Sequence, residues 1–143
     1  MKPIPHDPEL DDELQELYIL SNHWMSDIHF EEDEIKFLKK VTNNYRVSDL
    51  EIGQLNKIAD FNKILTEYDE TIANLKRKIN GLVSFIGVLV NDLNSEIRLE
   101  LIEKFADVQA EMKTLFDSVK QVKKLLFAFT EEVMKTEPLT LKA

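Results

Sequence analysis

The side chains best suited to chemistry are those of His23, Asp27, Glu31 and Glu34. The first three are spaced four residues apart, which on an α-helix lines their side chains along one strip. Imidazole and carboxylate groups bind zinc, but a zinc site needs tetrahedral geometry and one straight helix usually supplies only two ligands. Two interpretations stay open: a strip that binds a metal or small ligand, or a solvated, salt-bridged helix face. We expect the second, and therefore no metal and no cofactor.

Glu31 also lies in phase with the apolar stripe of its own helix. We expect it to reach the edge of a helical bundle and to pair with a lysine there. The alternative is a buried carboxylate with a functional role.

Other patterns that carry chemistry are missing from the sequence. A ferritin-like di-iron site needs two Glu-x-x-His pairs, and none of the three histidines has a glutamate three residues before it. There is no cysteine, no Gly-rich phosphate loop and no nucleophile elbow around a serine. The aromatic residues lie at core spacing, which is typical of packing rather than of a cofactor pocket. We therefore expect no catalytic residues and no enzymatic activity.

The composition favours one all-α domain. The chain has 143 residues, of which 43% are hydrophobic and 31% are charged. Only 3 glycines and 4 prolines are present, too few for the many turns of a β-rich fold. No apolar run approaches the roughly 20 residues of a membrane span, and the N-terminus does not resemble a secretory signal. We expect a cytoplasmic location.

The formal net charge of −9 is concentrated near the N-terminus, where residues 1–35 hold eleven acids and a single base, Lys2. An acidic surface repels nucleic acids and anionic membranes, so neither is an expected partner. The acidic segment is either a solvated helix face or a docking strip for a basic partner.

Three long helices are expected, at about 8–44, 48–93 and 95–136, followed by a frayed C-terminal tail. Asp7-Pro8 suits a helix start, Ser48 to Glu51 has the form of a capping box, and Glu137-Pro138 suits a helix end. Apolar residues three and four apart mark one face of each helix. The expected core positions are Leu10, Leu14, Leu17, Trp24, Ile28, Ile35 and Leu38; Ile58, Phe61, Leu65, Tyr68, Ile72, Leu75, Ile79, Leu82, Ile86, Leu89 and Leu93; and Ile97, Leu101, Phe105, Val108, Met112, Leu115, Val119, Val122, Leu126, Phe129 and Val133.

Such helices predict an up-down-up antiparallel bundle with left-handed, coiled-coil-like packing. A tight turn near position 46 would set Glu13 and Glu16 opposite residues 76–78. The same turn would set the acidic run 31–34 beside residues 58–61, near Lys57, Lys63, Lys123 and Lys124. Pairs of this kind select register and add little stability.

The end of the second helix is the first candidate for partner binding. This register would leave it projecting beyond the first helix, although it is apolar around most of its circumference. The N-terminal segment 1–5, a second copy of the chain, or another partner would then cover it. The residues concerned are Val83, Phe85, Ile86, Leu89 and Val90.

The stretch from His23 to Leu38 resembles a pattern in small all-helical proteins of the Bacteroidetes, in which a Trp, an acidic-Ile-x-Phe step and a Glu-Ile-x-Phe-Leu step precede a long second helix. The segments 60–62 and 67–72 are similar to the same pattern. No activity is assigned to those proteins, so the resemblance implies a helical bundle and brings no catalytic residue. The expected function is a non-enzymatic interaction or structural bundle, with self-association through the end of its second helix as one option, and the alternative is a bundle that binds a metal or small ligand.

Overall fold

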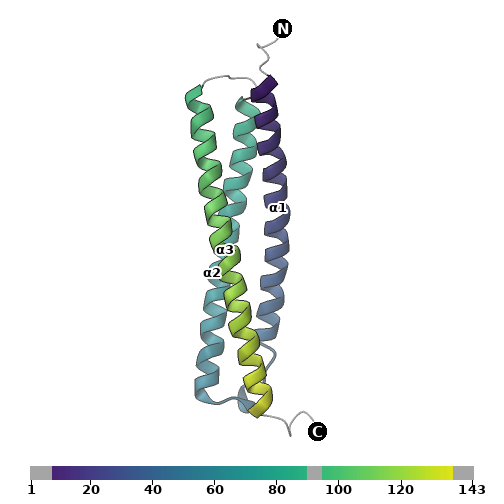
Figure 1. The fold of residues 1–143 in the computed structure, drawn as a ribbon. Coiled ribbons are helices and arrows are strands. Elements are labelled where there is room, and N and C mark those ends of the chain that lie inside the picture. Colours follow the sequence, from purple (N-terminus) through teal and green to yellow (C-terminus); the bar gives the residue numbers. More distant parts are fainter. Residues whose placement is uncertain (1–7, 90–94, 137–143) are drawn as a thin grey trace. The chain divides into compact units, whose positions relative to one another are not determined.

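The computed structural model describes the backbone of residues 8–89 and 95–136. Over these residues the chain forms three α-helices, α1 (Pro8–Thr42), α2 (Ile52–Leu89) and α3 (Ser95–Thr136), and a short 3-10 helix, η1 (Val47–Asp49) (Figure 1). No strand occurs in this described part. The predicted all-α class is therefore confirmed.

The start of α2 differs from the expected one. The predicted capping box at Ser48 is wrong, because Ser48 lies within η1 and the helix begins at Ile52. The backbone N–H of Glu51 donates to the side-chain Oε1 of Gln54 at 3.0 Å. This is the reach-back half of a capping box, placed three residues further along the chain.

The helix α2 is unbroken through Gly81 and Gly87. In the described residues no glycine has a positive φ, so both adopt ordinary helical backbone. The predicted continuity of this helix is confirmed as far as Leu89, and the expected residues 90–93 lie outside the described residues.

At the end of α1, Asn43 satisfies a backbone carbonyl that the helix would otherwise leave free. The Asn43 backbone N–H donates to the Lys39 carbonyl at 3.1 Å, and its side-chain Nδ2 donates to the same oxygen at 2.7 Å. The helix ends at Thr42, two residues before the expected end at about residue 44.

The contacts of the chain gather into two compact units. That the chain is one domain stays a prediction. Unit 1 comprises Met1–Phe30 and Ile72–Lys113, and unit 2 comprises Glu31–Thr71 and Thr114–Ala143. Each unit contains a segment of all three α-helices.

The core of unit 1 is formed by the predicted apolar stripes. The Trp24 and Phe105 rings lie 5.3 Å apart between centroids, joining α1 to α3. Ser21 is fully buried in this stripe, and its hydroxyl donates to the Leu17 carbonyl at 2.9 Å. The buried apolar residues of unit 1 are Leu14, Trp24, Ile28, Ile72, Leu75, Ile79, Leu82, Ile86, Leu101, Phe105, Val108 and Met112.

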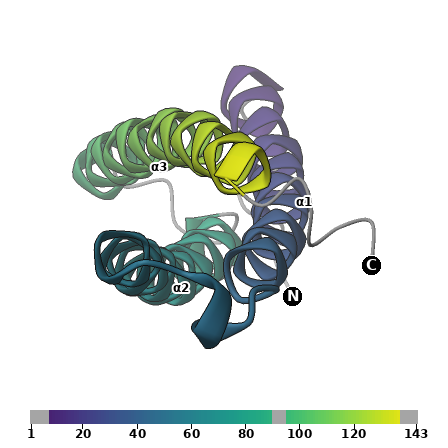
Figure 2. The ribbon, with the colours of Figure 1, turned by 90° about the horizontal axis from the view of Figure 1, so that it is seen from below.

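In unit 2 the segments of α1, α2 and α3 surround a common interior (Figure 2). Phe129 of α3 packs against two aromatic rings, Phe61 at 5.7 Å and Tyr45 at 6.1 Å between centroids. The Tyr45 hydroxyl lies 3.0 Å from Thr130 Oγ1. The buried apolar residues of unit 2 are Ile35, Leu38, Leu65, Leu115, Val119, Val122, Leu126, Phe129 and Val133.

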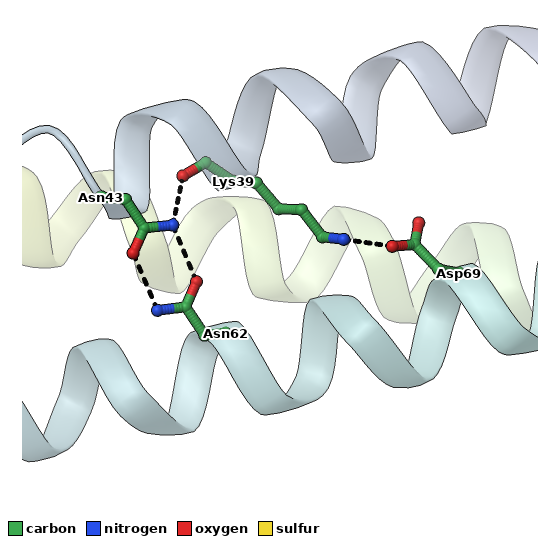
Figure 3. A network of polar contacts seen from close by, with 4 residues as sticks. All are labelled: Lys39, Asn43, Asn62 and Asp69. Carbon is green, nitrogen blue, oxygen red and sulfur yellow. Dashed lines mark hydrogen bonds and ion pairs between the residues drawn. The ribbon is translucent and has the colours of Figure 1, made fainter.

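Polar contacts fix how α1 meets α2 within unit 2 (Figure 3). The side-chain amides of Asn43 and Asn62 exchange two hydrogen bonds, and the Lys39 ammonium is paired with the Asp69 carboxylate. The predicted register, which set residues 31–34 beside 58–61, is therefore wrong. It assumed a tight turn, but residues 43–51 form a longer connection that includes η1.

Candidate functional site

The proposed ligand strip on α1 does not gather into a metal site. His23 and Asp27 are exposed in unit 1, whereas Glu31 and Glu34 belong to unit 2. Glu34 Oε1 lies 2.9 Å from Lys123 Nζ. Within the part of the chain that the structure describes, no group of three or more His, Asp or Glu side chains is placed to hold a metal ion.

Glu31 is 9% exposed, as its position in the apolar stripe predicts. Its pairing with a lysine stays a prediction. Ser21, the other polar residue in this stripe, is completely buried. The same face of α1 therefore points inward at both polar positions.

The ion pairs agree at one position with the expected pairing of α1 acids with lysines of the other two helices. Glu34 pairs with Lys123, as predicted. Lys57 and Lys78, both on α2, pair with glutamates of α3 rather than with the acids of α1. Lys57 Nζ lies 3.6 Å from Glu132, and Lys78 Nζ lies 2.6 Å from Glu111.

In unit 1, a groove of about 360 Å³ lies between α2 and α3. The Lys78–Glu111 ion pair lies at its edge, and the Lys104 ammonium lies 4.9 Å over the centre of the Phe85 ring. Lys104 also lies 3.3 Å from Glu100. The residues lining this unit 1 groove are Lys78, Gly81, Leu82, Phe85, Lys104, Asp107, Val108 and Glu111.

In unit 2, a second groove of about 360 Å³ lies between the same two helices. The Lys57–Glu132 ion pair lies at its edge, and the Lys57 ammonium lies 5.9 Å from the centre of the Phe129 ring. Leu125, in the lining, is 56% exposed. The residues lining this unit 2 groove are Lys57, Asp60, Phe61, Ile64, Leu125, Ala128, Phe129 and Glu132.

The two grooves are built from equivalent positions. Every lining residue of α2 in the unit 2 groove has its counterpart 21 residues later, as Lys57 has Lys78. Every lining residue of α3 has its counterpart 21 residues earlier, as Glu132 has Glu111. Because 21 residues are three heptads, the same helix faces recur at both grooves.

Only the lysine and the glutamate are the same in both grooves, and the other six lining positions differ. In the unit 2 groove Asp60 of α2 corresponds to Gly81, while Ala128 of α3 corresponds to Asp107, so each lining has one aspartate and one small residue at these positions. At the remaining positions the unit 2 groove has Phe61, Ile64, Leu125 and Phe129, where the unit 1 groove has Leu82, Phe85, Lys104 and Val108. Both grooves therefore offer apolar contact and a few charges.

The predicted partner-binding residues at the end of α2 have different surroundings. Val83 and Phe85 are partly exposed, and Phe85 lines the unit 1 groove. Ile86 is 5% exposed, so its side chain belongs to the core of unit 1. The side chain of Leu89 and all of Val90 lie outside the described residues.

Tyr68, on α2, is an ionisable residue whose pKa is raised. Burial raises the pKa of its phenol above the ordinary value of 10.0, a hydrogen bond with Ser118 acts in the opposite direction, and the nearby Glu67 carboxylate raises the pKa further. Tyr68 lies on α2 at a predicted core position, so the shift is a consequence of packing.

The sequence pattern did not single out the grooves. Leu125, Asp60 and Asp107 lie outside the apolar stripes, so the sequence pattern does not mark them as candidate binding residues. The signal that was available is the 21-residue spacing between Lys57 and Lys78, matched by the same spacing between glutamates on α3.

The chain matches no protein-family model, no curated protein and no solved structure. The resemblance of residues 23–38 to small helical proteins therefore stays a prediction. Within the described residues, no helix has both the length and the apolar character needed to cross a bilayer.

Proposed function

We propose that this chain is a non-enzymatic three-helix bundle that works by binding another protein, with a helix of the partner lying in a groove between α2 and α3. The observation that carries the proposal is that two grooves occur at equivalent helix positions three heptads apart, each with a lysine–glutamate ion pair in its lining. In each groove both helices contribute residues at i, i+3, i+4 and i+7, which is how a helix surface receives another helix.

The proposal includes an up-down-up arrangement with coiled-coil-like packing. In unit 2, Lys39 of α1 and Asn43, the residue after α1, contact Asp69 and Asn62 of α2, so the numbers rise along one segment as they fall along the other. Between α2 and α3, the pairs Lys57–Glu132 in unit 2 and Lys78–Glu111 in unit 1 follow the same antiparallel order. The spacing of three whole heptads supports the coiled-coil interpretation.

A photo-cross-linking amino acid at position 125 tests the binding function. Expressed in the cell from which the gene comes, the protein with the cross-linker at Leu125 is expected to give a discrete adduct. The matched control carries the same group at Lys40, which is exposed on α1 and outside both grooves. Equal adducts at the two positions, or none at position 125, would overturn the proposal.

Self-association through the end of α2 is a second candidate. Val88 is 56% exposed there, and Phe85 and Val83 are partly exposed. If this surface joins two copies, Phe85→Glu is expected to halve the mass measured by light scattering while helicity stays the same. The control Ser84→Glu puts a charge on the same helix without removing an apolar side chain. A wild type that is monomeric at high concentration removes this candidate.

A further inference from the structure

We infer that the unit 2 groove binds the apolar and cationic face of a basic amphipathic helix from a different protein. The inference rests on the proposed function and adds the chemical class of the partner. It is carried by a carboxylate with no partner, an uncovered apolar end, and the comparison with the equivalent groove of unit 1.

The carboxylate is that of Asp60. No hydrogen bond or ion pair joins it to another residue that the structure describes. The cation of the lining, Lys57, already lies 3.6 Å from Glu132. The lining therefore holds two carboxylates and one ammonium group, and a partner that brings a Lys or Arg side chain to Asp60 would complete the charge balance.

The apolar end of the groove is formed by Ile64 and by Leu125, which is 56% exposed. In the unit 1 groove the corresponding residues are Phe85 and Lys104, and the Lys104 ammonium covers the Phe85 ring at 4.9 Å. There the chain places its own lysine over the aromatic ring, although the two grooves have the same volume. In unit 2 both residues at this end are apolar, so the exposed leucine offers contact to an apolar side chain of a partner.

The unit 1 groove also shows which kind of group fits this shape. Lys104 lies against an aromatic ring and keeps an ion pair with Glu100 at 3.3 Å. A side chain with a long alkyl part and a terminal cation therefore fits a groove made from these helix positions. Its methylene groups can pack on apolar atoms while its cation stays paired with a carboxylate.

Charge at the groove favours a basic partner over a second copy of this chain. The excess of acids that gives the formal charge of −9 lies in residues 1–35, but the lining of the unit 2 groove itself holds two carboxylates against one ammonium group, and this lining attracts a basic helix. The acidic N-terminal segments of two copies repel one another. A helix carries residues at i, i+3, i+4 and i+7 on one face, which matches the spacing of the lining and lets apolar side chains reach Leu125 while a flanking Lys or Arg reaches Asp60.

The test uses a fluorescein-labelled three-heptad peptide with Leu at positions a and d and Lys at the flanking positions. Its binding to the full chain is followed by fluorescence anisotropy at about 0.15 M salt. The Lys peptide is expected to bind, and a peptide with Glu in place of every Lys is expected not to bind. Asp60→Asn is expected to weaken binding about threefold to tenfold. Leu125→Lys, which copies the residue of the unit 1 groove, is expected to weaken it by about tenfold or more.

Matched variants distinguish binding of the peptide at the unit 2 groove from general electrostatic attraction to the acidic chain. Asp33→Asn makes the same charge change at an exposed position of α1 and is expected to leave the affinity unchanged. Circular dichroism checks that each variant keeps its helicity, and Leu125→Ala gives a second, less disruptive change at the same position. Equal weakening by Asp33→Asn and Asp60→Asn would overturn the inference, as would equal binding of the Glu peptide or no binding at all.

One outcome separates this inference from the function on which it rests. If Asp107→Asn weakens the binding of the Lys peptide and Asp60→Asn does not, the site is the unit 1 groove. The choice of groove is then wrong, while binding of a helix by the α2 and α3 faces stands. If the peptide does not bind but position 125 still forms its adduct, the chemical class is wrong and the function stands.

Discussion

The side chains of Asn43 and Asn62 form a closed pair of hydrogen bonds within unit 2. Each amide donates from Nδ2 to the Oδ1 of the other, and both distances are 2.9 Å (Figure 3). The Asn43 amide also donates to the Lys39 carbonyl at the end of α1. One side chain thus closes a helix end and joins two helices at the same level.

Removing this pair is expected to lower stability by a modest amount. Asn43→Ala and Asn62→Ala should each reduce the free energy of unfolding by about 0.5–1.5 kcal/mol, because the pair is largely exposed. In a double-mutant cycle measured by urea unfolding, the second change should cost less in the background of the first. Strictly additive losses would contradict a direct interaction between the two amides.

Gly81→Ala is expected to stabilise the chain. Gly81 lies in the interior of α2 with ordinary helical backbone, and an added Cβ would meet nothing within 4 Å. Alanine restricts the unfolded chain more than glycine does, so the gain should be about 0.5–1 kcal/mol in urea unfolding. Gly53→Ala, near the start of the same helix, is the control and should give a smaller gain. A destabilised Gly81→Ala protein would show that the helix is distorted at this position.

The raised pKa of the Tyr68 phenol predicts that the folded protein loses stability in alkaline solution. Burial raises its pKa in the folded state above the ordinary value of 10.0, so the folded protein holds this proton more tightly than the unfolded chain. The stabilising contribution is complete below pH 10 and is lost as the pH rises through the higher, folded-state pKa. When the free energy of unfolding is measured against pH, the decrease caused by Tyr68 should appear in the wild type and be absent from Tyr68→Phe. Ser118→Ala removes a hydrogen bond that lowers the folded-state pKa, so the loss should begin at the same pH, extend to higher pH and become larger.

Two leucine-to-alanine changes in unit 2 should differ strongly in cost. Leu65 is fully buried and Leu125 is 56% exposed, although both lie on helices that border the same groove. Leu65→Ala should lower the free energy of unfolding by about 2–5 kcal/mol, because it leaves a cavity in the core. Leu125→Ala should change it by less than about 0.5 kcal/mol. A large loss at position 125 would mean that this side chain serves the core.

The apolar stripes were predictable because helical periodicity is a local property of the chain. All ten expected core positions of α3 with described side chains, from Leu101 to Val133, are buried. Ser21 and Glu31 are buried as well, since phase rather than polarity decides which face of α1 points inward.

The grooves were not predictable in the same way, because they depend on which residue of α2 faces which residue of α3. That pairing follows from the connections between helices. The tight turn assumed at position 46 misplaced the pairing of α1 with α2, because the periodicity did not reveal η1. The grooves lie between α2 and α3, and spacing alone does not tell whether side chains beside the apolar stripes, such as Asp60 and Leu125, line one groove.

The shared positions of the two grooves allow a direct exchange of their surface side chains. Since a lining residue in one groove has a counterpart three heptads away in the other, the exposed Asp60 and Leu125 can be exchanged with Gly81 and Lys104, whereas Leu82, Val108 and Phe129 are buried in the cores of their units and must stay. If the grooves bind partners as proposed, such an exchange would change the preference of each groove while the buried residues keep the helices in place.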